Sequence, residues 1–150
     1  MNWKVEKIKD EQTLAKAMKI REEVFVKEQK VAPEEEYDAF ETIASHFIVF
    51  DDRKEIATAR WRHTDKGIKL ERFAVLKPYR GKGVGSLMVK AVLEDILAHS
   101  ANTNKIIYLH GQVTAIGLYE KFGFEKMGGL FVECDIDHYL MELNPQQQIK

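Results

Sequence analysis

The sequence predicts an α/β fold built on a mixed central sheet of about six to seven strands. Three observations lead to this fold class. Strand-like segments separated by short turns fill residues 45–76 and predict antiparallel neighbours. A glycine-rich turn, Arg80–Gly85, follows them and opens a long helix-forming segment. An apolar segment, Lys105–Leu109, comes after that helix, so we expect the helix to join two parallel strands in a crossover, which is nearly always right-handed.

Composition is that of a soluble globular protein with one domain spanning residues 1–150. The 23 basic and 24 acidic residues leave a net charge of −1, which argues against nucleic-acid binding. No apolar signal follows Met1 and no run approaches the ~18 apolar residues of a membrane span, so we expect a cytoplasmic protein with no membrane contact. Cys134, the only cysteine, excludes an internal disulfide and a zinc-type cysteine cluster, and no metal is expected. The tail, residues 145–150, is expected to be frayed.

The strands expected in the first half of the chain are marked by apolar residues at alternating positions. In the second of them, Phe47 and Val49 are expected on one face of the sheet and His46 and Ile48 on the other. The turns between the last three strands are short, which predicts hairpins. The four strands are Trp3–Ile8, Ser45–Phe50, Glu55–Arg62 and Ile68–Leu76.

One amphipathic helix is expected between the first two strands. Asp10 or Thr13 can cap its start with a side-chain oxygen. Apolar residues then recur at helical spacing, which extends the helix to about Gln29.

An acidic segment, Val31–Glu41, follows this helix. Such a run usually forms a solvated loop. It could instead form the wall of a pocket for a cationic amine, with Tyr37 and Phe40 contacting its apolar part or anchoring the segment to the core. The acidic residues, with one just before the segment, are Glu28, Glu34, Glu35, Glu36, Asp38 and Glu41.

The second half of the chain predicts two further helices and the remaining strands. The helix after the glycine turn has only a narrow polar stripe, so we expect it to pack closely on the sheet. A short helix, Ala115–Phe122, ends at Gly123 in the left-handed conformation. Two closing strands, Glu125–Glu133 and Ile136–Leu143, complete the sheet.

The glycine turn has the features of a phosphate-binding loop. Glycines let the backbone approach a ligand closely, and the first N–H groups of the following helix point at an anion. Gly81-Lys82 is followed by Gly83 and not by Ser or Thr, so it is not a Walker A loop. The glycine spacing also differs from a dinucleotide fingerprint. The pattern present is Arg-x-x-Gly-x-Gly, formed by Arg80, Gly83 and Gly85.

Together with a second motif, this pattern resembles the GNAT superfamily of acyl-CoA N-acyltransferases. The second motif is Leu109–Phe124, whose Tyr-Glu-Lys-Phe-Gly-Phe end begins at Tyr119. The family implies a mixed sheet with antiparallel N-terminal strands, one splayed parallel pair and about four helices. Gln112 and Leu118 depart from common residues of the family, which often has Asn and Phe there, and Glu41 stands where the ElaA-like subgroup tends to have Asp. The chain looks most like the small bacterial ElaA-like group, whose marks here are Val24-Phe25-Val26-x-Glu28-Gln29, Glu36-x-Asp38, His46, Asp137-His138 and Met141.

The resemblance implies acetyl-CoA as the cofactor and co-substrate. It assigns the pyrophosphate to the backbone of Arg80, Gly81, Lys82, Gly83, Val84 and Gly85. It assigns the pantetheine arm to the backbone of Phe73, Ala74 and Val75, and Val75 N–H to the developing oxyanion. Gln112 would steady the pantetheine or the thiol.

The resemblance also implies that Tyr119 is the acid that protonates the leaving thiolate, since a phenol carries its proton at neutral pH. The sequence does not choose the base that deprotonates the acceptor amine. Glu71, Glu28, Asp38 and His110 are all candidates, and Glu28 and Asp38 are also candidates for acceptor binding. We expect structural roles for His46 and His138, and a small buried residue in Cys134, which has no evident partner for an acyl-cysteine route.

The function expected is therefore transfer of acetyl from acetyl-CoA to a primary amine by direct attack in a ternary complex. The amine could belong to a small molecule or to a protein lysine or N-terminus. One alternative is a non-enzymatic acyl-CoA-binding module that signals to a partner, and another is a nucleotide-binding protein. The closing strands could pair between subunits, which would make a homodimer.

Overall fold

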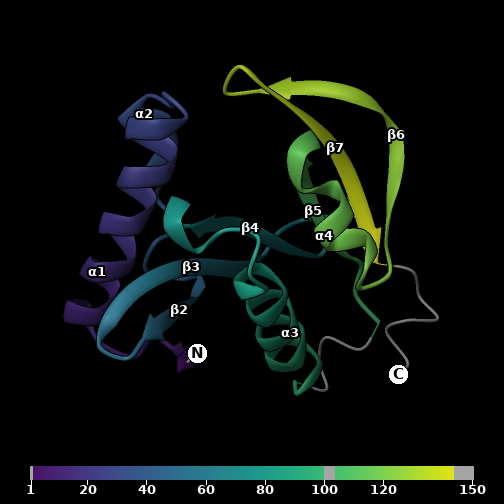
Figure 1. The fold of residues 1–150 in the computed structure, drawn as a ribbon. Coiled ribbons are helices and arrows are strands. Elements are labelled where there is room, and N and C mark those ends of the chain that lie inside the picture. Colours follow the sequence, from purple (N-terminus) through teal and green to yellow (C-terminus); the bar gives the residue numbers. More distant parts are fainter. Residues whose placement is uncertain (1, 100–103, 144–150) are drawn as a thin grey trace.

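The computed structural model describes residues 2–99 and 104–143, and its sheet has seven strands in the order β1-β2-β3-β4-β5-β7-β6 (Figure 1). The tail that was predicted to be frayed, residues 145–150, lies outside the described residues. Among the described residues, no helix is long and apolar enough to cross a membrane. The strands are β1 (Trp3–Lys7), β2 (Ser45–Asp51), β3 (Lys54–His63), β4 (Ile68–Val75), β5 (Ile107–Gln112), β6 (Phe124–Glu133) and β7 (Ile136–Leu143).

Among the strands that the structure describes, one neighbouring pair is parallel and the others are antiparallel, which confirms the predicted mixed topology. β4 and β5 run parallel and are joined through α3 (Val84–Leu97), whereas the pairs β1–β2, β2–β3, β3–β4, β5–β7 and β6–β7 are antiparallel. Parallel strands cannot be joined by a tight turn, so the helix that follows the glycine turn serves as the connection. The glycine turn is thereby placed at the end of β4.

The parallel pairing of β4 with β5 covers only three residue pairs, and Leu70 with Leu109 is the last of them. Beyond this point β5 continues to pair with β7 as far as Gln112. β4 continues to pair with β3 as far as Val75. The two central strands therefore diverge, and each keeps its outer neighbour.

A bulge in β4 lies where the divergence begins. The β3–β4 register shifts so that Arg72 and Phe73 together oppose Ala59 of β3. Arg72 has a positive φ of 58°, a conformation that is uncommon for residues other than glycine. Bulges bend a strand and re-aim its side chains, and they are frequent beside active sites.

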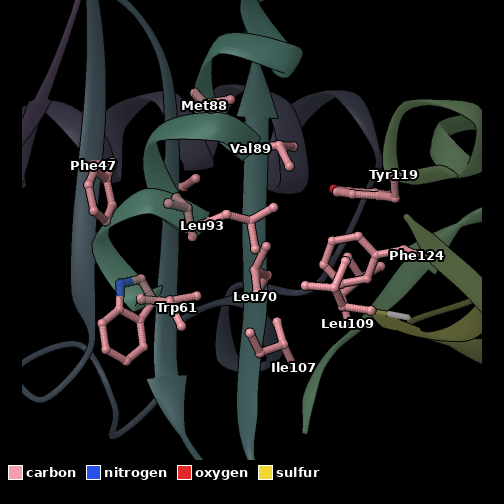
Figure 2. Close-up of a cluster of buried hydrophobic side chains, with 14 of the residues drawn as sticks. Phe47, Trp61, Leu70, Met88, Val89, Leu93, Ile107, Leu109, Tyr119 and Phe124 are labelled. Carbon is pink, nitrogen blue, oxygen red and sulfur yellow. The ribbon is translucent and has the colours of Figure 1, made fainter. Parts of the chain in front are cut away.

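Helices cover both faces of the sheet. α3 and α4 (Ile116–Glu120) pack on one face, and Figure 2 shows Met88, Val89 and Leu93 of α3 facing Leu70 of β4. α1 (Glu11–Arg21) and the segment after it pack on the other face. Within β2, Phe47 and Val49 join the first core and Ile48 joins the second, as the alternation predicts.

The first helical segment differs from the prediction in its second half. Asp10 caps α1 by accepting a hydrogen bond from Thr13 N–H at 2.7 Å. α1 ends at Arg21 and continues as a π-helix, η1 (Glu22–Glu28), closed by a Gln29 N–H bond to the Val24 carbonyl at 3.0 Å. The apolar spacing fits either kind of turn, so periodicity could not separate them.

The remaining boundaries shift by a few residues. The strand predicted to end at Leu109 continues to Gln112, because pairing with β7 extends it. The short helix predicted over Ala115–Phe122 is observed as α4, and a 3₁₀ turn, Val113–Ala115, leads into it. Gly123 has φ of 95°, which confirms the left-handed end of that helix. The acidic segment contains a helix that was not predicted, α2 (Pro33–Glu36).

Candidate active site

A cavity of about 470 Å³ lies where β4 and β5 diverge. Residues from both diverging strands line it, together with residues from α4, η1, the acidic segment and the β6–β7 turn. Its lining includes the predicted site residues Asp38, Glu71, Phe73, Gln112 and Tyr119, whereas Glu28 is not among them. The fold thus brings most of the sequence-predicted side chains to one place.

The glycine turn keeps its N–H groups accessible. Gly83 is the N-cap of α3, with φ of 96° and no side-chain capping bond. A Cβ atom at Gly81 or Gly83 would meet nothing within 4 Å, so the space above the turn is open. An uncapped helix N-terminus of this kind suits a phosphate, because its first N–H groups need an acceptor.

Arg80 links the glycine turn to β4 and to η1. Its Nε donates to the Val75 carbonyl at 2.9 Å, and its two terminal nitrogens donate to the Glu28 carboxylate at 2.5 and 2.7 Å. Glu28, predicted as an acceptor-binding residue, therefore lies beside the turn and is exposed. The hydrogen bonds from Arg80 lower the pKa of Glu28.

The backbone of Val75 faces the gap between the diverging strands. Leu76 N–H donates to the Ile56 carbonyl of β3, so Val75 and Ala57 face each other as a non-hydrogen-bonded pair. In such a pair the N–H and C=O of Val75 point away from β3. The Arg80 side chain donates to the Val75 carbonyl, and β5 no longer pairs with β4 at this level. Ala74, in contrast, pairs with Thr58 and its side chain is buried in the second core.

Tyr119 reaches from α4 towards β4 (Figure 2) and is 7% exposed. Its ring makes edge contacts with Phe73 and Phe124, at centroid distances of 5.9 and 6.1 Å. Burial raises the pKa of the phenol, so it carries its proton at neutral pH. No hydrogen bond holds its hydroxyl within residues 2–99 and 104–143, and the group lines the cavity.

The side chain of Gln112 is held by a residue on the opposite side of the cavity. Its side chain exchanges two hydrogen bonds with the side chain of Gln29, at 3.0 and 3.3 Å. The pair connects the end of β5 to the end of η1, on opposite sides of the gap. An amide held on both atoms is a rigid part of the lining.

The acidic segment does not form a solvated loop, and this expectation was wrong for three of its carboxylates. Glu36 is 2% exposed and binds Arg21 through two hydrogen bonds of 3.1 and 3.0 Å. Glu41 accepts bonds from both Arg21 and Arg60, at 2.7 Å each. The segment is therefore fastened to the sheet by ion pairs, because two arginines are buried beneath it.

Asp38 and Glu71 bind the same buried guanidinium. Arg60 donates to Asp38 at 2.6 and 3.0 Å and to Glu71 at 2.7 Å. Burial opposes ionisation of Asp38, but the hydrogen bonds and charge of Arg60 outweigh it and lower its pKa to about 2. Burial is likewise outweighed at Glu71, where Arg60 and Arg62 lower the pKa. Both carboxylates are ionised and held by cations.

A histidine pair with a carboxylate lines the other side of the cavity. His110 Nδ1 lies 3.1 Å from Glu133, and His138 Nε2 lies 3.8 Å from the other carboxylate oxygen. The hydrogen bond from His110 lowers the pKa of Glu133 to about 2. His138 is buried and bonds the Ile136 carbonyl at 2.6 Å. In the part of the chain that the structure describes, no group of such side chains could hold a metal ion.

Cys134 differs from the small buried residue that was predicted. It is partly exposed in the β6–β7 turn, with φ of 51°, and it lines the cavity. Partial burial and a hydrogen bond with Glu35 raise the pKa of its thiol to about 11. The thiol is therefore a poor nucleophile at neutral pH.

Several site residues were not predicted from the sequence. For two of them the sequence offers a positional clue. Arg60 stands among apolar residues in a predicted strand, and Arg21 stands where the helical spacing of Ala17 and Ile20 predicts a buried residue. Nothing in the pattern marked the others. The missed residues are Arg21, Arg60, Arg62, Lys69, Arg72 and Glu133.

The family is shown by comparison with known proteins. The family model of the acetyltransferase (GNAT) domain matches residues 5–145. The chain therefore belongs to the GNAT acetyltransferases, which use acetyl-CoA as co-substrate. This confirms the resemblance found in the two sequence motifs.

Named relatives cover nearly the whole chain. The uncharacterized N-acetyltransferase YjcF of Bacillus subtilis is 40% identical over 134 residues, which are 89% of this chain and 94% of YjcF. The uncharacterized protein YyaT of the same organism is 37% identical over 140 residues, 91% and 93% of the two chains. The crystal structure of Escherichia coli ElaA shares the fold, with a TM-score of 0.82, 24% identity and coverage of 95% and 99%. The expected likeness to ElaA is thus confirmed at the level of the fold.

The ion pair between Asp38 and Arg60 predicts a specific loss of stability in acid. The folded-state pKa of Asp38, about 2, lies below the ordinary value of 3.8, so the unfolded chain binds more protons between these pH values. The contribution of Asp38 to the free energy of unfolding is complete above about pH 4 and is lost as the pH falls to about 2. Asp38→Asn should lower the free energy of unfolding by about 2 kcal/mol at neutral pH and flatten this part of the pH dependence, as measured by urea unfolding.

Asp65→Asn is the matched control, because Asp65 is exposed and forms no ion pair with another described residue. It should leave both the neutral-pH stability and its acid dependence unchanged. Equal acid dependence in Asp38→Asn and the unmodified protein would contradict the role assigned to Asp38.

Proposed function

We propose that the protein transfers the acetyl group of acetyl-CoA to a primary amine by direct attack in a ternary complex. The single observation that carries this proposal is the cavity between the diverging strands, which is lined by Phe73 and Tyr119 and lies two residues along β4 from the open backbone of Val75. Membership of the GNAT family supplies the donor, and the relative YjcF carries the name N-acetyltransferase.

The open glycine turn and the gap beside Val75 fit the two parts of an acyl-CoA donor. The uncapped N-terminus of α3 would bind the pyrophosphate through the N–H groups of Gly83, Val84 and Gly85. Phe73 lines the cavity and Val75 points its N–H into the gap, so this stretch of β4 would hold the pantetheine arm as a neighbouring strand would. The thioester supplies an activated acyl group. The Val75 N–H would donate to its oxygen as negative charge develops there.

Tyr119 is proposed as the acid that protonates the leaving thiolate. A buried, protonated phenol with no hydrogen-bond partner among the described residues is available to donate. Direct transfer is favoured over an acyl-cysteine because Cys134 keeps its proton at neutral pH. The acetyl group would then be transferred in a single step from the thioester sulfur to the amine nitrogen.

Among the four candidate bases, His110 is the one we propose. Glu28, Asp38 and Glu71 are each hydrogen-bonded by arginine and have lowered pKa values, which makes each of them a weak proton acceptor. A carboxylate can only accept hydrogen bonds, so Glu133 places the proton of a neutral His110 on Nδ1. The Nε2 lone pair then points away from Glu133, and no described residue donates a hydrogen bond to it. Glu133 is the positioning residue for this base.

Tyr119→Phe should lower kcat by about two to four orders of magnitude, because it removes the acid and keeps the ring that packs on Phe73 and Phe124. The measurement is release of free thiol from acetyl-CoA against a panel of amines. Tyr139→Phe, on β7 and outside the cavity, should turn over as the unmodified protein does. Equal turnover by Tyr119→Phe would remove Tyr119 from the mechanism, and tight CoA binding without turnover on any amine would favour an acyl-CoA-binding module instead.

His110→Ala should lower kcat by at least about a hundredfold, and added imidazole should restore part of the rate by replacing the missing base. The same assay measures both effects. His99→Ala is the control, since His99 lies at the exposed end of α3. A rate for His110→Ala equal to that of the control would show that another group accepts the amine proton.

A further inference from the structure

We propose that Arg62 and Lys69 form a carboxylate-binding subsite, and that the acceptor is an amine that also bears a carboxylate. The inference rests on the proposed N-acetyltransferase function, because it names the acceptor class for the same cavity. Both residues line that cavity, on β3 and β4, beside the point where β4 and β5 part.

The two cations are direct cross-strand partners. In the register of β3 and β4, Arg62 lies opposite Lys69, and each side chain is only 15% exposed. Like charges in this arrangement destabilise a sheet unless an anion lies between them. Glu71 is that anion, with its oxygens 2.7 Å from Arg62 Nε and 3.4 Å from Lys69 Nζ.

Glu71 alone does not satisfy these two side chains. It also accepts from Arg60, so one carboxylate serves three cations. The terminal nitrogens of Arg62 have no acceptor in the described structure, and Lys69 has only the long contact to Glu71. Among the described residues no buried side-chain nitrogen or oxygen lacks a partner, so these unpaired donors are accessible, and a ligand carboxylate in the cavity can accept hydrogen bonds from them.

The other cations of the cluster find most of their acceptors within the protein. Arg21 and Arg60 use all three of their nitrogens within the protein. Arg72 donates to Asp38 and to the Glu36 carbonyl. Among the described residues, the hydrogen-bonding capacity left in the cluster therefore lies on Arg62 and Lys69, with one terminal nitrogen of Arg72.

Phe40 holds the Arg62 guanidinium in place. The guanidinium carbon lies 3.8 Å from the centroid of the Phe40 ring, which stacks against its face. A stacked guanidinium can still donate from its edges, which match the two oxygens of a carboxylate. Phe40 belongs to the acidic segment, so that segment contributes an aromatic clamp and not a free negative wall.

The ion-paired cluster that includes Arg62 and Lys69 has an excess of positive charge. The ion-paired cluster holds five cationic side chains and four carboxylates, which leaves one positive charge in excess. Glu133 lines the opposite side of the cavity, where it is bound to His110 and lies near His138, and the charge of Lys69 contributes to lowering its pKa. A carboxylate placed against Arg62 and Lys69 would neutralise this excess locally, whereas a cation placed there would add to it. The members are Arg21, Arg60, Arg62, Lys69 and Arg72, with Glu36, Asp38, Glu41 and Glu71.

The test compares amines that differ only in the anionic group. Glycine, β-alanine and γ-aminobutyrate are each assayed against their primary amides, with putrescine as the cationic amine and phosphoethanolamine as the phosphate-bearing one. At least one carboxylate-bearing amine should show a kcat/KM at least about tenfold above that of its amide. Higher kcat/KM for the amides or putrescine would overturn the proposal, and preference for phosphoethanolamine would overturn the assignment to carboxylate.

Variants test whether the preference comes from these two residues. Arg62→Gln and Lys69→Gln should each reduce the ratio of kcat/KM between the preferred carboxylate and its amide by about tenfold, mostly through KM. Arg53→Gln and Lys4→Gln, at exposed positions, should retain the ratio. An unchanged ratio in folded Arg62→Gln and Lys69→Gln would overturn the subsite, and thermal melts establish that the variants fold.

Direct binding separates this inference from the proposed function. The affinity of the same amines is measured by calorimetry with CoA present, without any turnover. Carboxylate binding that Arg62→Gln abolishes would support the subsite even if no amine were acetylated, a result that would contradict only the proposed function. Acetylation of amines with no carboxylate-dependent affinity would contradict only the subsite.

Discussion

The site depends on one constraint, which is that β4 and β5 can pair over only three residues. β5 is held by β7 as far as Gln112, and β4 is held by β3 and bent by the bulge at Arg72. Each strand follows its outer neighbour, so the centre of the sheet opens. Backbone groups that would otherwise complete a ladder are left facing a cavity, and a ligand with extended amide groups can bond to them.

A second constraint keeps this opening from collapsing. Arg60 lies at the centre of the sheet and is fully buried, so it requires anions around it. The acidic segment supplies Asp38 and Glu41, and β4 supplies Glu71. The segment is thereby fixed across one side of the cavity. The same ion pairs offset the negative charge of Asp38 and Glu41, so the acidity of the segment does not by itself set the polarity of the acceptor site.

The sequence predicted the strands, the parallel crossover and the two motifs that carry the family resemblance, because each is encoded locally. Glycines at fixed spacing require a particular turn, and alternation in β2 places Phe47 and Ile48 on opposite faces. It did not predict the ion pairs around Arg60 or the contact of His110 with Glu133. Those partners are 11 to 23 residues apart in the chain, and no local pattern links them. The π-helical turn was missed for a different reason, since its apolar spacing also fits an α-helix.

The central claim is that the gap beside Val75 holds the acyl donor, and amide hydrogen exchange tests it most directly. The exchange rate of the Val75 N–H is measured with and without saturating CoA, with the Ala74 N–H, which faces β3, as an internal reference. The account predicts that CoA slows exchange at Val75 by at least about tenfold and much less at Ala74. Tight binding of CoA with no added protection at Val75 would contradict it.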